Sequence, residues 1–85
     1  MRKSSPSALV TDNGQRVLFR IERRFYELPQ EELRSLLELP PGPAGLGVTI
    51  DRDRFYFEFA GDDQSAEIST KQLHRRLRKR VPTQT

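Results

Sequence analysis

Six cations stand within the ten residues from Lys71 to Arg80, and no acidic residue lies among them. Lys and Arg carry the charge that phosphate groups attract, and the planar guanidinium of Arg can hold two phosphate oxygens at once. Because no acid is interleaved, the segment differs from the ion-paired outer face of an ordinary surface helix. The pattern indicates a surface that contacts nucleic-acid phosphates, DNA or RNA. The candidate nucleic-acid-binding residues are Lys71, Arg75, Arg76, Arg78, Lys79 and Arg80.

The same cations allow other interpretations. Positive charge near the C-terminus of a helix is stabilised by the helix dipole alone. Residues 1–70 hold nine Lys/Arg and twelve Asp/Glu, whereas residues 71–85 hold six Lys/Arg and no acid. A basic helix attached to an acidic body could therefore dock on an acidic protein surface, including a second copy of this chain. A membrane surface is disfavoured, because the segment lacks the bulky apolar face that such helices bury.

A second basic set follows the strand pattern of residues 17–21. If Val17, Phe19 and Ile21 face the core, the alternating cations project from the opposite face, and a tyrosine of a neighbouring strand could join them. These possible secondary nucleic-acid contacts are Arg16, Arg20, Arg24 and Tyr56. The alternative is the polar outside of a sheet, with Glu22 and Glu58 paired to the arginines.

Other chemistry finds little support. The chain has no Cys, which excludes disulfides and thiolate sites and favours a reducing, cytoplasmic location. The acids of Asp51–Asp53 and Asp62–Asp63 lie in expected turns without the spacing of a calcium loop. His74, the one histidine, has no recognisable nucleophile beside it. We therefore expect no catalytic residue, metal, cofactor or small-molecule substrate, and no enzyme activity.

The elements that position these residues can be read from periodicity. Alternation predicts strands at 17–21, 46–50 and 55–59 and a short strand at 66–68, while Asn13-Gly14 and Asp51–Arg54 predict hairpin turns. Whether Ala8–Thr11 pairs with the first strand is left open. The spacing of Leu33, Leu36 and Leu37 predicts a helix that begins at Pro29 and stops at Pro40.

The last helix has a clear start. Ser69 is a good N-cap, Gln72 completes a capping box, and Ile68 and Leu73 can form a hydrophobic staple. Leu73, Leu77 and Val81 form the apolar seam of this helix. From Pro29 onward the order helix–strand–strand–strand–helix resembles that of double-stranded-RNA-binding domains. The hairpin at Asp51–Arg54 is short and acidic here, so no family and no residue role is assigned.

The expected fold is α+β: a small antiparallel sheet, in the order β-α-β-β-β-α, with two helices packed on one face. At 85 residues the chain is one domain, residues 8–81, between a disordered tail at 1–7 and a frayed tail at 82–85. No segment reaches the roughly 20 apolar residues of a membrane span. The expected core is listed as Val17, Phe19, Ile21, Leu33, Leu36, Leu37, Val48, Ile50, Phe55, Phe57, Phe59, Ile68, Leu73 and Leu77.

Overall fold

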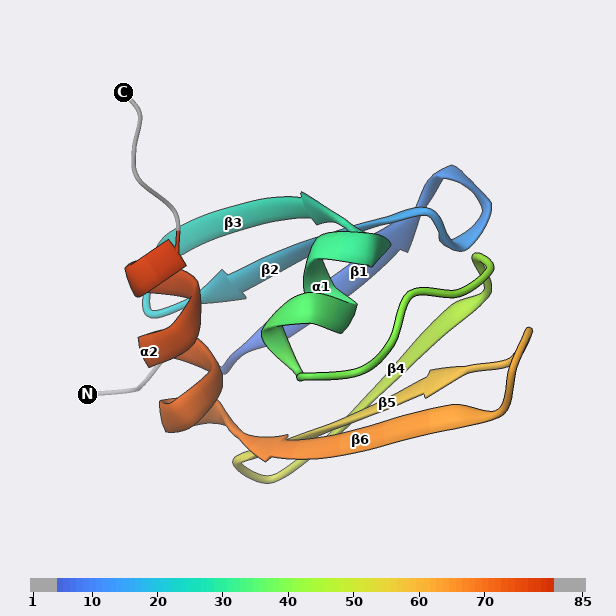
Figure 1. Ribbon diagram of the computed structural model, residues 1–85. Coiled ribbons are helices and arrows are strands. Elements are labelled where there is room, and N and C mark those ends of the chain that lie inside the picture. The colour runs from blue at the N-terminus through green and yellow to red at the C-terminus, as the bar shows by residue number, and fades with distance from the viewer. Residues whose placement is uncertain (1–4, 81–85) are drawn as a thin grey trace.

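Two three-stranded antiparallel sheets and two helices make up the fold (Figure 1). The computed structural model describes residues 5–80, without the side chain of Arg80. The first sheet contains β1 (Ser7–Thr11), β2 (Arg16–Ile21) and β3 (Arg24–Pro29), and helix α1 (Gln30–Leu36) follows it. The second contains β4 (Leu46–Asp51), β5 (Arg54–Phe59) and β6 (Gln64–Ser69), and helix α2 (Thr70–Arg80) follows it. A short 3-10 turn, η1 (Asp12–Gly14), joins β1 to β2.

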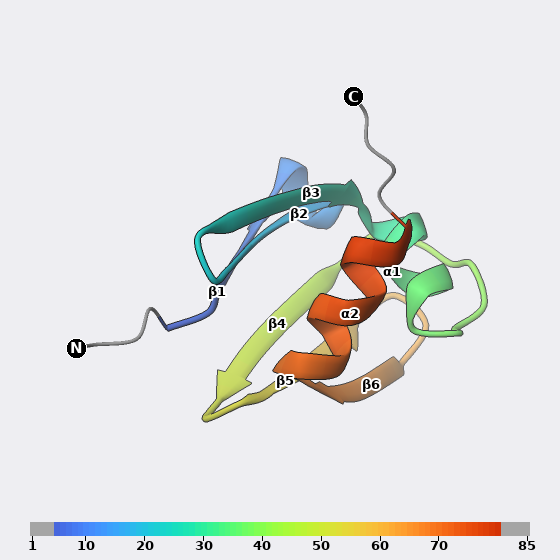
Figure 2. The ribbon, with the colours of Figure 1, turned by 90° about the vertical axis from the view of Figure 1, so that its left-hand side faces the viewer.

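The α+β class is confirmed, but the expectation of a single sheet is wrong. β1, β2 and β3 form a sheet of their own, and β4, β5 and β6 form the other. The sheets lie on opposite sides of the core, and the helices fill the space between them on the side away from β1 and β4 (Figure 2). The observed order is therefore β-β-β-α-β-β-β-α rather than β-α-β-β-β-α.

The unexpected strand is β3, and its turn explains why the sequence did not reveal it. Glu22 and Arg23 join β2 to β3 with φ of 53° and 71°. Positive φ at both central positions is typical of a tight hairpin turn, which Asn and Gly favour for steric reasons. With Glu and Arg there, the sequence carries no turn signal. Pro29 consequently ends β3 and caps α1 instead of standing in its first turn.

The other hairpins agree with the sequence patterns. The Asn13-Gly14 turn joins β1 to β2, and Thr11 pairs with Arg16, which settles the pairing of the first segment. β4 and β5 pair so that Asp51 meets Arg54 across the turn. β6 is longer than the predicted 66–68 strand. Of the predicted tails, residues 1–4 and 81–85 lie outside the described residues, as does Val81 of the expected seam, and β1 already begins at Ser7.

The core lies between the two sheets. The alternating apolar residues of β2 and β5 are fully or almost fully buried, and Phe19 makes edge-to-face contacts with Phe55 and Phe57. Two buried residues were not expected in the core: Leu28 on β3 and Leu46 on β4. Leu36, Leu37, Val48 and Ile50, which were expected there, pack against the core but are only partly buried. The full buried set is Val17, Phe19, Ile21, Leu28, Leu33, Leu46, Phe55, Phe57, Phe59, Ile68, Leu73 and Leu77.

The fold consists of the same unit twice. Each unit is a three-stranded meander followed directly by a helix: β1–β2–β3–α1 and then β4–β5–β6–α2. Corresponding residues stand forty apart in the second part of each unit, where β3 and β6 begin at Arg24 and Gln64 and the helices at Gln30 and Thr70. We call this the structural repeat. It was not found from the sequence, because the two units share few residue identities.

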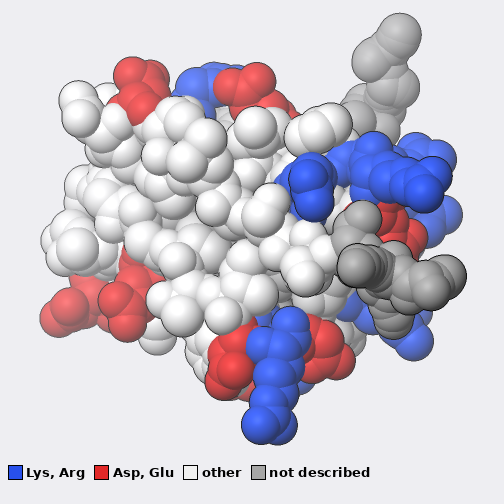
Figure 3. All heavy atoms as spheres, turned by 180° about the vertical axis from the view of Figure 1, so that it is seen from behind, with Lys and Arg blue, Asp and Glu red and all other residues white. Residues whose placement is uncertain are grey.

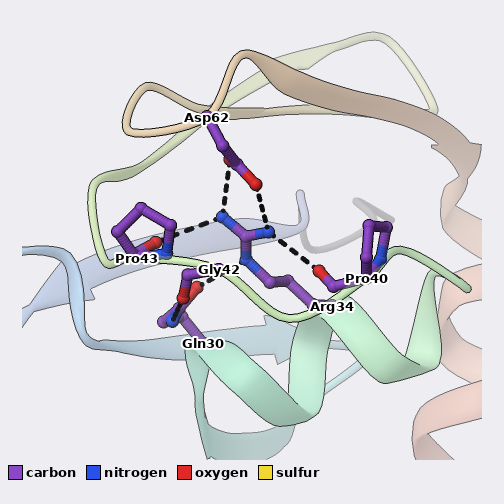
Figure 4. Close-up of polar contacts among 6 residues, drawn as sticks. All are labelled: Gln30, Arg34, Pro40, Gly42, Pro43 and Asp62. Carbon is purple, nitrogen blue, oxygen red and sulfur yellow. Dashed lines mark hydrogen bonds and ion pairs between the residues drawn. The ribbon is translucent and has the colours of Figure 1, made fainter.

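A buried arginine joins the two units (Figure 4). Arg34 on α1 is 0% exposed, and its Nε donates to Oε1 of Gln30 at 3.0 Å. Its Nη1 and Nη2 donate to both carboxylate oxygens of Asp62 at 3.0 and 2.9 Å, and to the carbonyls of Pro40 and Pro43 at 2.9 and 3.1 Å. All five N–H groups of the guanidinium therefore have an acceptor. Arg34 holds the β5–β6 turn to α1, and it holds the loop at 40–43 together with Gln30, whose Nε2 donates to the Gly42 carbonyl at 3.3 Å.

The surroundings of Arg34 complete this cluster. The guanidinium carbon lies 4.4 Å from the ring centroid of Phe59, a cation–π contact. Gly42 approaches so closely that a Cβ there would lie 2.5 Å from Nη1 of Arg34. The hydrogen bonds from Arg34 hold the pKa of the Asp62 carboxyl below its ordinary value of 3.8.

Candidate nucleic-acid interface

Helix α2 starts where the sequence predicts. The Gln72 N–H donates to the Ser69 hydroxyl at 3.1 Å, which satisfies one of the N–H groups that a helix start leaves without a partner. Ile68, Leu73 and Leu77 are buried, so the predicted seam packs on the core. The register of this seam decides which cations face outward.

Four of the predicted cations line one hollow on the outer side of α2. Lys71, Arg75, Arg78 and Lys79 are exposed, and all four border an open space of about 770 Å³. The remaining lining comes from Ile21, Glu22, Asp53, Thr70 and His74, so the turns β2–β3 and β4–β5 form the other wall. Four cations face two carboxylates there, and the hollow has an excess of positive charge.

The Lys and Arg side chains around the hollow have no ion-pair partner within 4.0 Å among the described side chains. The cations that do form such pairs are Arg16, Arg34 and Arg54. None of these three lies on α2. The interpretation in which α2 pairs with the acidic body of its own chain therefore finds no such contact among the described side chains.

Among the predicted residues of α2 with described side chains, one stands apart from the hollow. Arg76 is half-buried, and its Nη1 donates to the Leu36 carbonyl at 2.9 Å. It therefore ties α2 to the end of α1. Arg80 ends the helix, but its side chain lies outside the described ones.

His74 fills the inner wall of the hollow. It is 7% exposed, its Nε2 lies 2.9 Å from the Tyr26 hydroxyl, and its Nδ1 lies 3.9 Å from Oε1 of Glu22. This arrangement suits a ring that accepts the Tyr26 proton at Nε2 and carries its own proton on Nδ1. By the structural repeat, His74 occupies the place of Arg34, and Glu22 that of Asp62. His74 joins α2 to the other unit through its hydrogen bond with Tyr26 on β3, whereas its approach to the exposed Glu22 is longer than a hydrogen bond.

The second basic set is not brought together as expected. Arg16 and Arg20 share the outer face of the first sheet, and Nε of Arg16 donates to Glu27 at 3.2 Å. Arg24 lies opposite the buried Ile21 in the pairing of β2 with β3. It therefore shares the inner face of the sheet with Ile21, although its own side chain is exposed. Tyr56 lies in the other sheet, between Thr49 and Glu67.

Both acidic segments noted in the sequence contribute a contact that holds the fold. Asp53 accepts the Thr70 N–H at its backbone carbonyl, at 2.7 Å, and Asp62 binds Arg34. In residues 5–80, no group of three or more His, Cys, Asp or Glu side chains is arranged to hold a metal ion. Within the same range, no helix is long and apolar enough to cross a bilayer.

Sequence reasoning missed the far wall of the hollow. Glu22 and Asp53 come from two turns that lie far from α2 in the sequence and were noted only as surface and turn residues. Nothing in their spacing indicates that they face Arg75 and Arg78. The one local signal near this wall was the N-cap of α2 at Ser69. The next residue, Thr70, donates its N–H to the Asp53 carbonyl, so the start of α2 lies beside the β4–β5 turn.

Comparison with known proteins adds no functional assignment. The chain matches no family model, no curated protein and no solved structure.

Proposed function

We propose that this protein binds nucleic acid, without catalysis, by contacting phosphates through the exposed face of α2. The observation that carries the proposal is the set of four exposed cations around one hollow, none of which has an ion-pair partner among the described side chains. From Lys71 to Lys79 the helix rises about 12 Å, at roughly 1.5 Å per residue. This length spans several consecutive phosphates of a strand, at about 3.4 Å per nucleotide along a duplex axis.

The expected binding is electrostatic and strongly dependent on salt. Four phosphate contacts release bound counterions and give a slope of log affinity against log salt of about −3.6 for duplex DNA. Between 50 and 200 mM salt the affinity should therefore fall on the order of 100-fold. Charge placement supplies no means of reading bases, so little sequence preference is expected.

The test is a fluorescence-anisotropy titration with labelled DNA and RNA, duplex and single-stranded, at those two salt concentrations. The triple variant Arg75→Gln/Arg78→Gln/Lys79→Gln should lose nearly all affinity. The comparison variant, Arg16→Gln/Arg20→Gln/Arg24→Gln, removes the same charge from the second basic set, away from the hollow, and should keep at least a third of it. Circular dichroism checks that both variants fold.

Two results would contradict the proposal. Absence of binding to every probe at 50 mM salt would leave an acidic protein surface as the better partner for α2. Equal losses in the two triple variants would mean that net charge alone, rather than the face of α2, accounts for binding.

A further inference from the structure

Phe25 is the exception among the phenylalanines of this protein. Phe19, Phe55, Phe57 and Phe59 are fully buried in the core, whereas Phe25 is 66% exposed. It stands on β3, opposite Arg20 of β2, in a pair that belongs to the outer face of the first sheet. The fold therefore makes no use of this ring in the core and presents it to a ligand.

Three exposed arginines flank the ring. Arg20 lies opposite Phe25, Arg24 precedes it on β3, and Arg23 stands in the β2–β3 turn. None of the three has an ion-pair partner within 4.0 Å among the described side chains. Glu22 is the one acid between Arg20 and Phe25 in the sequence. The end of this hairpin thus combines an exposed aromatic ring with an excess of positive charge.

The end of the hairpin adjoins the hollow of α2. Ile21 and Glu22 line that hollow, and Arg23 follows them directly in the turn. The β2–β3 turn and α2 lie at the same end of the molecule (Figure 1). Seen from behind, Lys and Arg gather mainly at that end, while a broad area elsewhere has no charged side chain (Figure 3). The cationic surface of α2 therefore continues over the turn to Phe25.

An aromatic ring among cations fits a nucleic acid whose bases are unpaired. In a duplex the faces of the bases are stacked on one another, so only phosphates and groove edges are available to this surface. In a single strand an unpaired base can stack on an aromatic side chain, while cations hold the phosphates on either side. Because every base has such a face, this contact requires no particular sequence.

We propose that the nucleic acid bound by α2 is single-stranded, and that one of its bases stacks on the ring of Phe25. The strand then crosses the β2–β3 turn between this ring and the hollow. The inference rests on the proposed function and narrows its class of ligand. The main phosphate contacts remain on α2, while Arg20, Arg23 and Arg24 add a weaker attraction that salt screens.

Anisotropy titrations at 200 mM salt test the proposal, because salt weakens phosphate contacts more than stacking. The probes are a labelled strand of about 12 thymidine nucleotides, and the same strand paired with its complement. We expect the natural chain to bind the single strand at least about fivefold more tightly than the duplex. This preference should be lost when the ring is removed.

Substitutions at Phe25 separate stacking from plain apolar contact. Phe25→Leu keeps an exposed apolar side chain without a ring, and it should weaken single-strand binding at least about fivefold while changing duplex binding less than about twofold. Phe25→Tyr keeps the ring and should stay within about twofold of the natural chain. The control is Leu9→Ala, since Leu9 is 58% exposed on the same face of the sheet, and both affinities should be unchanged.

Ultraviolet cross-linking locates the stacked base independently of the affinities. Irradiation of the complex links a thymine to a side chain in contact with it, and mass spectrometry of the digested product identifies that residue. We expect the link at Phe25, since the other four phenylalanines are buried, and its disappearance in Phe25→Leu.

Three results would overturn the inference. Equal or tighter binding of the duplex at 200 mM salt, still lost in the Arg75→Gln/Arg78→Gln/Lys79→Gln variant, would keep α2 as the interface but make the ligand double-stranded. Unchanged single-strand binding in Phe25→Leu, with no link at Phe25, would exclude the ring from the interface and again leave the proposed function intact. Absence of binding to every probe, at 50 mM salt as well, would remove the inference together with the proposed function.

Discussion

Arg34 carries a full charge into a place from which water is excluded, and it does so with every donor occupied. A buried charge costs several kcal/mol unless it is paired and hydrogen-bonded, so its acceptors must be positioned by the fold. The sequence shows Arg34 only as one more cation on a helix. Its acceptors lie on the helix, the proline-rich loop and a turn of the other unit, which only the folded chain brings together.

Replacing Arg34 should therefore destabilise the protein strongly. Arg34→Met keeps the length of the side chain but removes all five donors, and we expect the free energy of unfolding to fall by about 3 kcal/mol at pH 7. Urea denaturation followed by circular dichroism measures this loss. Arg34→Lys, which keeps the charge but cannot hold both Asp62 oxygens and two carbonyls, should be destabilised as well. An unchanged midpoint in Arg34→Met would mean that the cluster does not hold the fold.

Asp62 gives the same contact a dependence on pH. Its carboxyl pKa is lowered below 3.8, first of all by the hydrogen bonds from Arg34. A carboxyl whose pKa is lower in the folded state stabilises the fold above its unfolded pKa, and this contribution is lost as the pH falls through the folded pKa. Asp62→Asn should therefore be less stable than the natural chain at pH 7, with the difference shrinking below pH 4. Thermal unfolding between pH 2 and pH 7 checks this, and a difference that stays constant with pH would contradict it.

At the scale of helices and strands, the start of α2 can be predicted from the sequence, whereas the end of α1 cannot. α2 begins at Ser69 as predicted, because the N-cap depends on one local hydrogen bond. α1 ends at Leu36, earlier than the prolines indicated, because Glu38 adopts φ of 63°. The Glu38 and Leu39 N–H groups donate to the carbonyls of Ser35 and Arg34, a Schellman ending that Gly usually supplies.

The N-cap of α2 offers a local test. Ser69→Ala removes the acceptor of the Gln72 N–H, and we expect a loss of about 1 kcal/mol of stability. Ser65→Ala, at an exposed position of the same strand, serves as the control and should change little. Equal midpoints for the two variants in urea would show that the cap contributes nothing.

Features that depend on residues close together in the sequence could be predicted, whereas features that depend on contacts between distant residues could not. Strands with alternating apolar residues, such as 55–59, were identified because one face is buried throughout. β3 escaped because Arg24 and Phe25 are exposed and the turn before it has neither Gly nor Asn. The cationic half of the candidate interface was visible as a run of charge. Its other wall, with Glu22 and Asp53, comes from two turns that only the folded chain brings beside α2, and no local pattern encodes this.

At the scale of the whole molecule, the two units depend on each other. Each sheet buries its inner face against the other sheet, and each helix is tied to the other unit, by Arg34 with Asp62 and by His74 with Tyr26. Neither unit alone has a second layer to cover its apolar face. We therefore expect the structural repeat to behave as one domain rather than two.

Fragments 1–44 and 45–85 test this dependence. We expect each to be largely unfolded alone and an equimolar mixture to recover the circular dichroism spectrum of the intact chain. The same mixture made with Arg34→Met in the first fragment should recover less of it. Cooperative thermal unfolding of either fragment by itself would refute the interdependence.

The pairing of strands only with their neighbours in the chain has a consequence for kinetics. Each sheet closes only short loops, which costs little chain entropy, so its hairpins can begin to pair before the two units pack together. Side-chain hydrogen bonds between the units join residues 28, 40 and 48 positions apart, namely Arg34 with Asp62, Arg76 with Leu36, and Tyr26 with His74. Contacts made after the rate-limiting step govern the rate of opening rather than the rate of formation. We expect the contacts between the units, the apolar core together with these polar pairs, to determine the lifetime of the native state, and the hairpins to determine its speed of assembly.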